Sequence, residues 1–274
     1  MHDRPSFAFL CGIAVLAAAC QRTTPPPAQP DAARGDALLR QMSQSLGNTQ
    51  TFSYTADEVR QHVRTNGEKV EEHFSRHVVI RRPSGLTFSD EGSRETQGWY
   101  DGKYVTLVSH KATVWARGPM PPTLDEALDF ISAEYAIQLP TADLLYSNPY
   151  DALMTKDTHG GWVGTDAIDG KMYDHLAYQQ PVVDWELWLT QDDRKLVKRV
   201  HILYKTDPGQ PWTRVTFRDW HPTEPVTDAT FTPQVPDGYR RIKIMRHATV
   251  SDGTLEAASD AAPSGQAAPA ATPK

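Results

Sequence analysis

The chain has 274 residues, a formal net charge of -6 and 39% hydrophobic residues. This length allows one or two domains with a sizeable core, and the mixed charges form no basic stripe of the kind that binds nucleic acid. We therefore expect no nucleic-acid partner, and we interpret the mild acidity as favouring solubility.

The first twenty residues are predicted to be a targeting segment. Residues 7–19 are apolar or small, too few to span a bilayer, and Ala17 and Ala19 have the spacing of a signal-peptidase site. Cys20 follows directly and resembles the lipobox cysteine of bacterial lipoproteins, although Ala17 stands where leucine is usual. We predict a signal peptide over residues 1–19 and lipidation of Cys20, with a plain signal-peptide end as the alternative. By resemblance to enterobacterial sorting, Gln21 favours the outer membrane.

The two cysteines, Cys11 and Cys20, both lie in this segment, so no disulfide is expected. Acyl chains on Cys20 would anchor the protein to a membrane. Residues 20–35 are proline-rich and predict an extended tether. Residues 248–274 are rich in Ala and Pro and predict a disordered tail. The folded domain is therefore expected over residues 36–247.

The domain is predicted to open with a helix and to continue as sheet. Apolar residues at helical spacing begin at Leu38 and end before Gly47, a typical helix stop. From Phe52 the period becomes two, which indicates strands. The dipeptides Asn66-Gly67 and Asp101-Gly102 are hairpin turn signals.

A helical block interrupts the sheet. Thr123 and Glu126 form a capping-box pattern, so a helix is expected to start there. Pro140 separates it from a second apolar stretch, and Asn148 with Pro149 predicts a last short helix whose N-cap is Asn148.

Sheet resumes after His159. A third hairpin signal lies at Asp169-Gly170, and alternating runs cover residues 182–190, 195–205, 212–222 and 239–245. About ten or eleven strands result, mostly joined by hairpins and hence antiparallel. The order of helix, strands, helices and strands predicts an α+β fold with its helices on one face.

Catalytic motifs are not found. The chain has no G-x-S-x-G elbow, H-E-x-x-H, P-loop or G-x-G-x-x-G. His73 and His77 are interpreted as solvated strand residues, and Asp184 and Glu186 as outward carboxylates available for cross-strand pairing. We predict no catalytic residue, no metal site and no cofactor.

The seven Trp and ten Tyr residues leave two readings open. They could form an ordinary core, or they could line a cavity that a curved antiparallel sheet leaves on its concave face. Trp, Tyr, Leu and Met suit an adaptable pocket for acyl chains. The central helices would then be a lid over the cavity or, alternatively, a permanent plug.

The central stretch also carries a family resemblance. The helix over 123–135, then "LPTADLLYS" and "NPYDAL", with "DGKYVTLVSH" before them and "HLAYQQPVVDWELWLT" after them, resembles a family of predicted periplasmic proteins of unassigned function. That family is similar to the LolA/LolB/LppX-like superfamily, whose members carry or sense lipids or lipoproteins. The resemblance spans about residues 32–244. It implies a curved antiparallel half-barrel around an apolar cavity, with an N-terminal helix and a central helical lid.

The resemblance and the residues together predict a non-catalytic, periplasm-facing lipoprotein that binds an acyl chain, a lipid or a lipoprotein under the lid. The alternative is an envelope sensor or scaffold whose half-barrel binds a protein partner, for example by pairing at a sheet edge. The residues predicted to line the cavity or the lid are Leu128, Ile131, Tyr135, Leu144, Leu145, Leu153, Trp185 and Leu187.

Overall fold

The computed structural model describes residues 29–135 and 139–244. The predicted signal peptide, Cys20 and the predicted tail lie outside these residues, so lipidation stays a prediction. Residues 32–35, placed by prediction in the tether, form the first turn of a helix.

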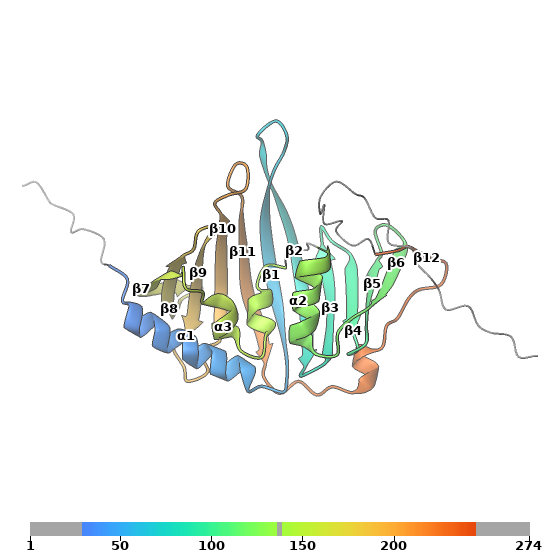
Figure 1. Ribbon diagram of the computed structural model, residues 1–274, viewed down its shortest axis with the longest axis horizontal. Helices are drawn as coiled ribbons and strands as arrows, with labels where there is room; N and C mark the ends of the chain where they lie inside the picture. Colours follow the sequence, from blue (N-terminus) through green and yellow to red (C-terminus); the bar gives the residue numbers. More distant parts are fainter. Residues whose placement is uncertain (1–28, 136–138, 245–274) are drawn as a thin grey trace, which may run out of the picture.

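A single open sheet dominates the described residues (Figure 1). Its strand order is β12-β6-β5-β4-β3-β2-β1-β11-β10-β9-β8-β7, and every pair except the parallel β12–β6 is antiparallel. The sheet does not close, because β12 and β7 lie at opposite ends of this order. The strands are β1 (Thr51–Val63), β2 (Lys69–Arg81), β3 (Gly85–Gly92), β4 (Thr96–Tyr100), β5 (Tyr104–Ser109), β6 (Val114–Pro119), β7 (His159–Ile168), β8 (Lys171–Gln179), β9 (Val183–Thr190), β10 (Val197–Tyr204), β11 (Trp212–His221) and β12 (Arg240–Arg241).

The sheet consists of two meanders. Strands β1 to β6 form one and β7 to β11 the other, and they join where β1 pairs with β11. The predicted hairpin dipeptides lie at the β1–β2, β4–β5 and β7–β8 turns, where Gly67, Gly102 and Gly170 take positive φ angles of 83°, 83° and 75°. The antiparallel half-barrel prediction is confirmed, with one strand more than expected.

The extra strand is β3, in which apolar and polar residues do not alternate regularly along the sequence. Leu86 and Phe88 point to the same face, but the next position on that face is Asp90. Asp90 is nonetheless buried, because it pairs with Arg76 on β2.

The helices α1 (Ala32–Gly47), α2 (Leu124–Tyr135) and α3 (Pro149–Leu153) and the 3-10 helix η1 (Ala142–Leu145) lie on one face of the sheet (Figure 1). A second 3-10 helix, η2 (Asp228–Phe231), lies apart from them, and its Phe231 packs against Gly85 and Arg81. The predicted capping box is confirmed, since Glu126 N donates to Thr123 Oγ1 (3.3 Å) and Thr123 N donates to Glu126 Oε2 (3.3 Å).

The predicted short helix is confirmed, with Asn148 at the N-cap position and Pro149 as the first helical residue. The Asn148 side chain, however, makes no capping hydrogen bond. Its Oδ1 accepts a hydrogen bond from Ser43 of α1 (3.0 Å), and its Nδ2 donates to Asp151 (2.6 Å). The side chain therefore joins α3 to α1.

The first turn of α1 packs against edge strand β7 through direct contacts between the two backbones. Asp31 and Trp162 exchange two hydrogen bonds, of 2.8 and 3.0 Å. Gly35 and Gly161 face each other so closely that a Cβ on Gly35 would lie 2.5 Å from Gly161 Cα. The guanidinium of Arg34 lies over the Trp162 ring, 3.6 Å from its centroid.

The main core lies between the helices and the sheet. It includes Leu39 and Met42 of α1, Phe52 of β1 and Phe217 of β11, all almost completely buried. The helices thus fill much of the concave face with side chains.

Candidate functional site

A half-open cavity of about 370 Å³ remains between the concave face and the segment 139–155, which we call the lid segment. The lid segment contains η1 and α3. The floor is formed by β9 and β10, and the mouth by residues that follow β8 and β10. The lining residues are Leu139, Pro140, Thr141, Asp143, Leu144, Ala152, Leu153, Thr155, Gln180, Val182, Val183, Trp185, Leu187, Val200, Ile202, Tyr204, Thr206 and Asp207.

Alternation along the two floor strands explains the apolar floor. Successive strand residues point to opposite faces, so Trp185 and Leu187 of β9 share the cavity side with Val200 and Ile202 of β10. The register pairs Leu187 with Val200 and Trp185 with Ile202. Tyr178 of β8 stacks on Trp185, with ring centroids 4.3 Å apart, and supports the wall.

Polar contacts hold the back of the lid segment in place. Ser147 N donates to Asp125 of α2 (2.9 Å), and Tyr146 OH donates to Asp129 of the same helix (2.7 Å). Arg82, just after β2, donates to the carbonyls of Leu145 (2.8 Å) and Tyr146 (2.9 Å). The lid segment is therefore tied to α2 and to the sheet, while its first residues face the cavity.

Four of the eight residues predicted for the cavity line it: Leu144, Leu153, Trp185 and Leu187. Leu128 is instead buried in the main core, and Leu145 packs against that core. Ile131 and Tyr135 are half-buried on α2 and do not line the cavity. The structure thus brings together residues of the lid segment and of β9, but not those of α2.

Sequence reasoning missed most of the β10 wall and the polar residues of the cavity. Val200, Ile202 and Tyr204 fall at every second position of β10, and this period of two places them on one face without distinguishing core from cavity. Gln180 could not be foreseen, because it follows the end of β8. Its amide donates to Leu153 O (2.9 Å) and Thr158 Oγ1 (2.9 Å), linking the mouth to the end of α3.

The charges around the cavity are acidic. Asp143 and Asp207 line it, whereas no Lys, Arg or His among the described residues does. Burial raises the pKa of the Asp143 carboxyl above its ordinary value, because the charged form is poorly solvated there. Burial and a hydrogen bond to Asp129 likewise raise the pKa of Tyr146.

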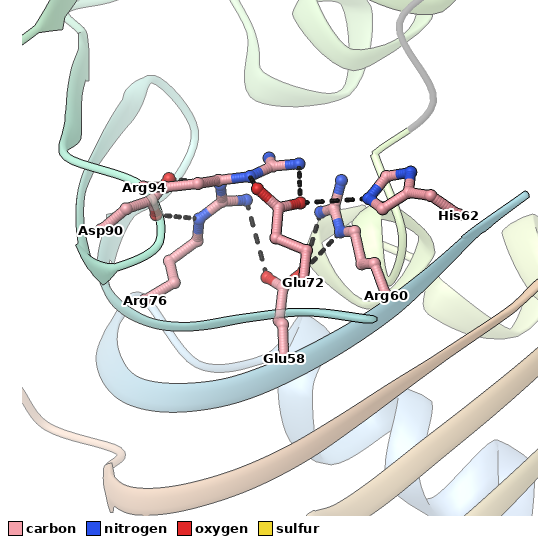
Figure 2. Close-up of polar contacts among 7 residues, drawn as sticks. All are labelled: Glu58, Arg60, His62, Glu72, Arg76, Asp90 and Arg94. Carbon is pink, nitrogen blue, oxygen red and sulfur yellow. Dashed lines mark hydrogen bonds and ion pairs between the residues drawn. The ribbon is translucent and has the colours of Figure 1, made fainter. Parts of the chain in front are cut away.

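Farther along the helix-side face, a network of charged side chains replaces apolar packing (Figure 2). Arg76 pairs bidentately with Asp90 (2.6 and 2.9 Å) and approaches Glu58 (3.7 Å), which also pairs with Arg60 (2.7 Å). The side chains of Asp90 and Glu58 are only 1% and 3% exposed. This part of the concave face is therefore filled by ion pairs.

A second pair extends the network toward the β1–β2 hairpin. Arg94 donates to Glu72 (3.0 and 2.8 Å), and His62 lies 3.3 Å from the same carboxylate. The Arg94 hydrogen bonds lower the pKa of Glu72 from 4.5 to about 2. Because the pKa of Glu72 is lower in the folded state than in the unfolded state, the ionised carboxylate stabilises the fold at pH values above 4.5. This contribution is lost as the pH falls from 4.5 toward 2.

We expect Glu72→Gln to flatten the pH dependence of the free energy of unfolding between pH 4.5 and pH 2. At pH 7 the variant should lose about 1–2 kcal/mol of its free energy of unfolding, since the Glu72–Arg94 pair is partly solvated. Urea unfolding at a series of pH values measures this slope. Glu91→Gln, at an exposed position on neighbouring β3, is the control and should keep the slope. An unchanged slope in Glu72→Gln would show that the Arg94 pair does not stabilise the fold.

The opposite face of the sheet confirms the prediction for the outward carboxylates. Asp184 pairs with Lys205 (2.7 Å), and Glu186 pairs across strands with His175 (2.7 Å). Hydrogen bonds from His175 and His201 lower the pKa of Glu186 to about 2. His73 and His77 are exposed, as predicted.

Among the residues that the structure places, no group of three or more His, Cys, Asp or Glu side chains could hold a metal ion. Within residues 29–135 and 139–244, no helix is long and apolar enough to cross a bilayer. The arrangement offers a hydrophobic binding volume with hydrogen-bonding groups at its mouth.

The model of a family described as "Predicted periplasmic protein (DUF2092)" matches residues 35–245. No curated protein matches the chain in sequence.

Several solved structures are similar to this one. Lipoprotein LppX of Mycobacterium tuberculosis is 13% identical, with a TM-score of 0.42 over 70% of this chain and 96% of that one. A LolA superfamily protein of Nitrosomonas europaea is 12% identical, with a TM-score of 0.37 over 74% and 99%. MucA/MucB of Pseudomonas aeruginosa gives 16% identity and a TM-score of 0.42 over 74% and 63%. Because all three scores lie below 0.5, no functional conclusion follows from them.

Proposed function

Because the chain belongs to the DUF2092 family of predicted periplasmic proteins, we propose that it binds one acyl chain in the cavity under the lid segment, in the periplasm and without catalysis. The observation that carries this proposal is the half-open cavity itself, which has a floor of Trp185, Leu187, Val200 and Ile202.

The cavity size favours a single chain. Pockets for small molecules measure about 300–1,000 Å³, and about 370 Å³ lies near the lower limit. Several acyl chains of one lipoprotein would not fit together. Burial of one chain supplies about 0.8 kcal/mol per CH₂ group, from which the cost of association is subtracted.

The mouth gives the bound chain an exit for its polar end. Val182 is 53% exposed beside it, and Gln180, Thr206 and Asp207 also line this side. A ligand with an apolar tail and a polar head therefore fits better than a wholly apolar molecule.

Ala152→Trp is expected to weaken acyl-chain binding at least tenfold, because the indole would occupy the space that Ala152 leaves open. The probe is a brominated dodecanol, whose bromine quenches Trp185 when the chain is bound. Trp185→Phe should remove most of the saturable quenching and so assign the signal to this cavity.

The matched control is Ala133→Trp, which adds the same side chain at an exposed position of α2 outside the cavity. This variant should bind like the wild type. Absence of saturable quenching in the wild-type protein would refute acyl-chain binding.

A protein partner is the second candidate, and the open edge of the sheet favours it. In the described part of the chain, Asp31 alone pairs with the outer edge of β7, at Trp162. A partner strand could add beyond that point. A photo-crosslinker at Thr165, exposed on β7, should then give a specific adduct in the periplasm. Without such an adduct, this candidate fails.

A further inference from the structure

The charged side chains that line the cavity all have the same sign. Among the described residues, the formally charged ones in its lining are Asp143 and Asp207, and both are acidic. A second, more open hollow adjoins it on the other side of the lid segment and shares Asp143 and Ala152. That hollow adds Asp125, Asp129 and Asp151, and no Lys, Arg or His of residues 29–135 and 139–244 lines it.

Asp143 differs from the other three carboxylates of the second hollow. Asp125 accepts hydrogen bonds from Ser147, Asp129 accepts one from Tyr146, and Asp151 accepts one from Asn148. These three carboxylates hold the lid segment together. In the described part of the chain, no side chain of another residue donates to Asp143.

Two neighbouring cations, Lys205 and Arg82, are engaged elsewhere, and a third, Lys156, is exposed and lines neither hollow. Lys205, next to Thr206 of the mouth, pairs with Asp184 on the opposite face of the sheet. Arg82 is bonded to the carbonyls of Leu145 and Tyr146 and lines neither hollow. Among the residues that the structure describes, no cation in the cavity wall therefore compensates an anionic head group.

We propose that the ligand of this cavity is a single-chain amphiphile with a cationic head group, such as a primary amine. This inference rests on the proposed function and adds the charge of the ligand. The tail lies on the floor formed by β9 and β10. The ammonium group lies within reach of Asp143 or, at the mouth, of Asp207.

The physical reason is electrostatic complementarity in a partly desolvated site. Coulomb interactions are several times stronger there than in water. The two aspartates therefore attract an ammonium head group and repel a carboxylate or phosphate head group. The partly buried carboxyl of Asp143 also gains a partner for its charged form, which offsets the effect of burial on its pKa.

The test compares three ligands that differ only in the head group: dodecylamine, dodecanol and dodecanoate. Binding to the full chain is measured by calorimetry at pH 7, below the micelle concentration of the two charged ligands and below the solubility limit of dodecanol. We expect the amine to bind at least tenfold more tightly than the alcohol, and dodecanoate to bind more weakly than the alcohol. Higher salt should reduce the preference for the amine.

The double variant Asp143→Asn/Asp207→Asn is expected to bring the amine and the alcohol within about threefold of each other. Asp193→Asn is the control, since Asp193 lies in the β9–β10 turn, at the other end of these strands from the cavity. It should keep the full preference.

The outcomes separate this inference from the proposed function. If dodecanol binds and dodecylamine binds no more tightly, the charge preference is overturned while acyl-chain binding stands. If no ligand of the three binds, the proposed function itself is overturned. If the double variant prefers the amine as strongly as the wild type does, the two aspartates are not the source of the charge preference.

Discussion

Arg76→Met is expected to lower the free energy of unfolding by about 3–5 kcal/mol, because it leaves the buried carboxylate of Asp90 without its cation and leaves buried Glu58 paired with Arg60 alone. Arg76 is bidentate to Asp90 and lies 3.7 Å from Glu58. Both carboxylates are almost completely buried, so water cannot replace the guanidinium (Figure 2). Chemical denaturation monitored by tryptophan fluorescence measures the loss.

The control for this prediction is Arg218→Met, which breaks an ion pair with Asp57 at a position where both side chains are about half exposed. Its expected cost is about 0–1 kcal/mol. The triple variant Glu58→Leu/Arg76→Met/Asp90→Leu should recover much of the loss, because apolar packing can replace a buried ion network. Equal costs for Arg76→Met and Arg218→Met would show that burial does not strengthen the network.

Gly161→Ala is expected to destabilise the protein by about 3 kcal/mol, at the upper end of what overpacking costs. The added Cβ would lie 2.4 Å from Asp31 O and 2.7 Å from Ala32 Cα. Both are backbone atoms, so no side-chain rotation relieves the clash and the start of α1 must move away from β7. Hydrogen exchange should show loss of protection in the first turns of α1.

Ala167→Val, an exposed position on the same strand, is the matched control and should be nearly neutral. A Gly161→Ala protein with unchanged stability and unchanged protection of α1 would show that the helix does not depend on this close approach.

The sheet was predictable because its turns have sequence signals that depend only on the local backbone. The Asn-Gly and Asp-Gly dipeptides take the positive φ angles that tight hairpins need, for example 51° at Asp169 and 75° at Gly170. Strand β3 was not predictable, since the pairing of Asp90 with Arg76 depends on the register of another strand. The period of two would have placed Glu58 on the same face as Tyr54 and Ala56, but its cation could not be identified from sequence.

The site was predictable in its residue types and only partly in its location. Helical spacing identifies an apolar face on α2, but it does not say whether this face meets a core or a cavity. Leu128 meets the core, whereas Leu144, a buried residue of η1, meets both core and cavity. The acidic lining arises where the lid segment meets the residues after β10, which are distant in sequence, so no local pattern indicates it.

The strand order also bears on how the chain reaches this structure. Each meander consists of neighbouring hairpins and can form from local contacts, whereas the β1–β11 junction joins residues that are far apart in the chain, such as Ala56 and Phe217. Closing so long a loop costs entropy before any contact compensates it, so we expect the junction to form late. The two meanders would then form while β1 and β11 are still unpaired. In pulsed hydrogen exchange, the amides of the β1–β11 junction should gain protection last. The same strand order makes the β1–β11 junction the place where two copies of the chain could exchange meanders during refolding at high concentration.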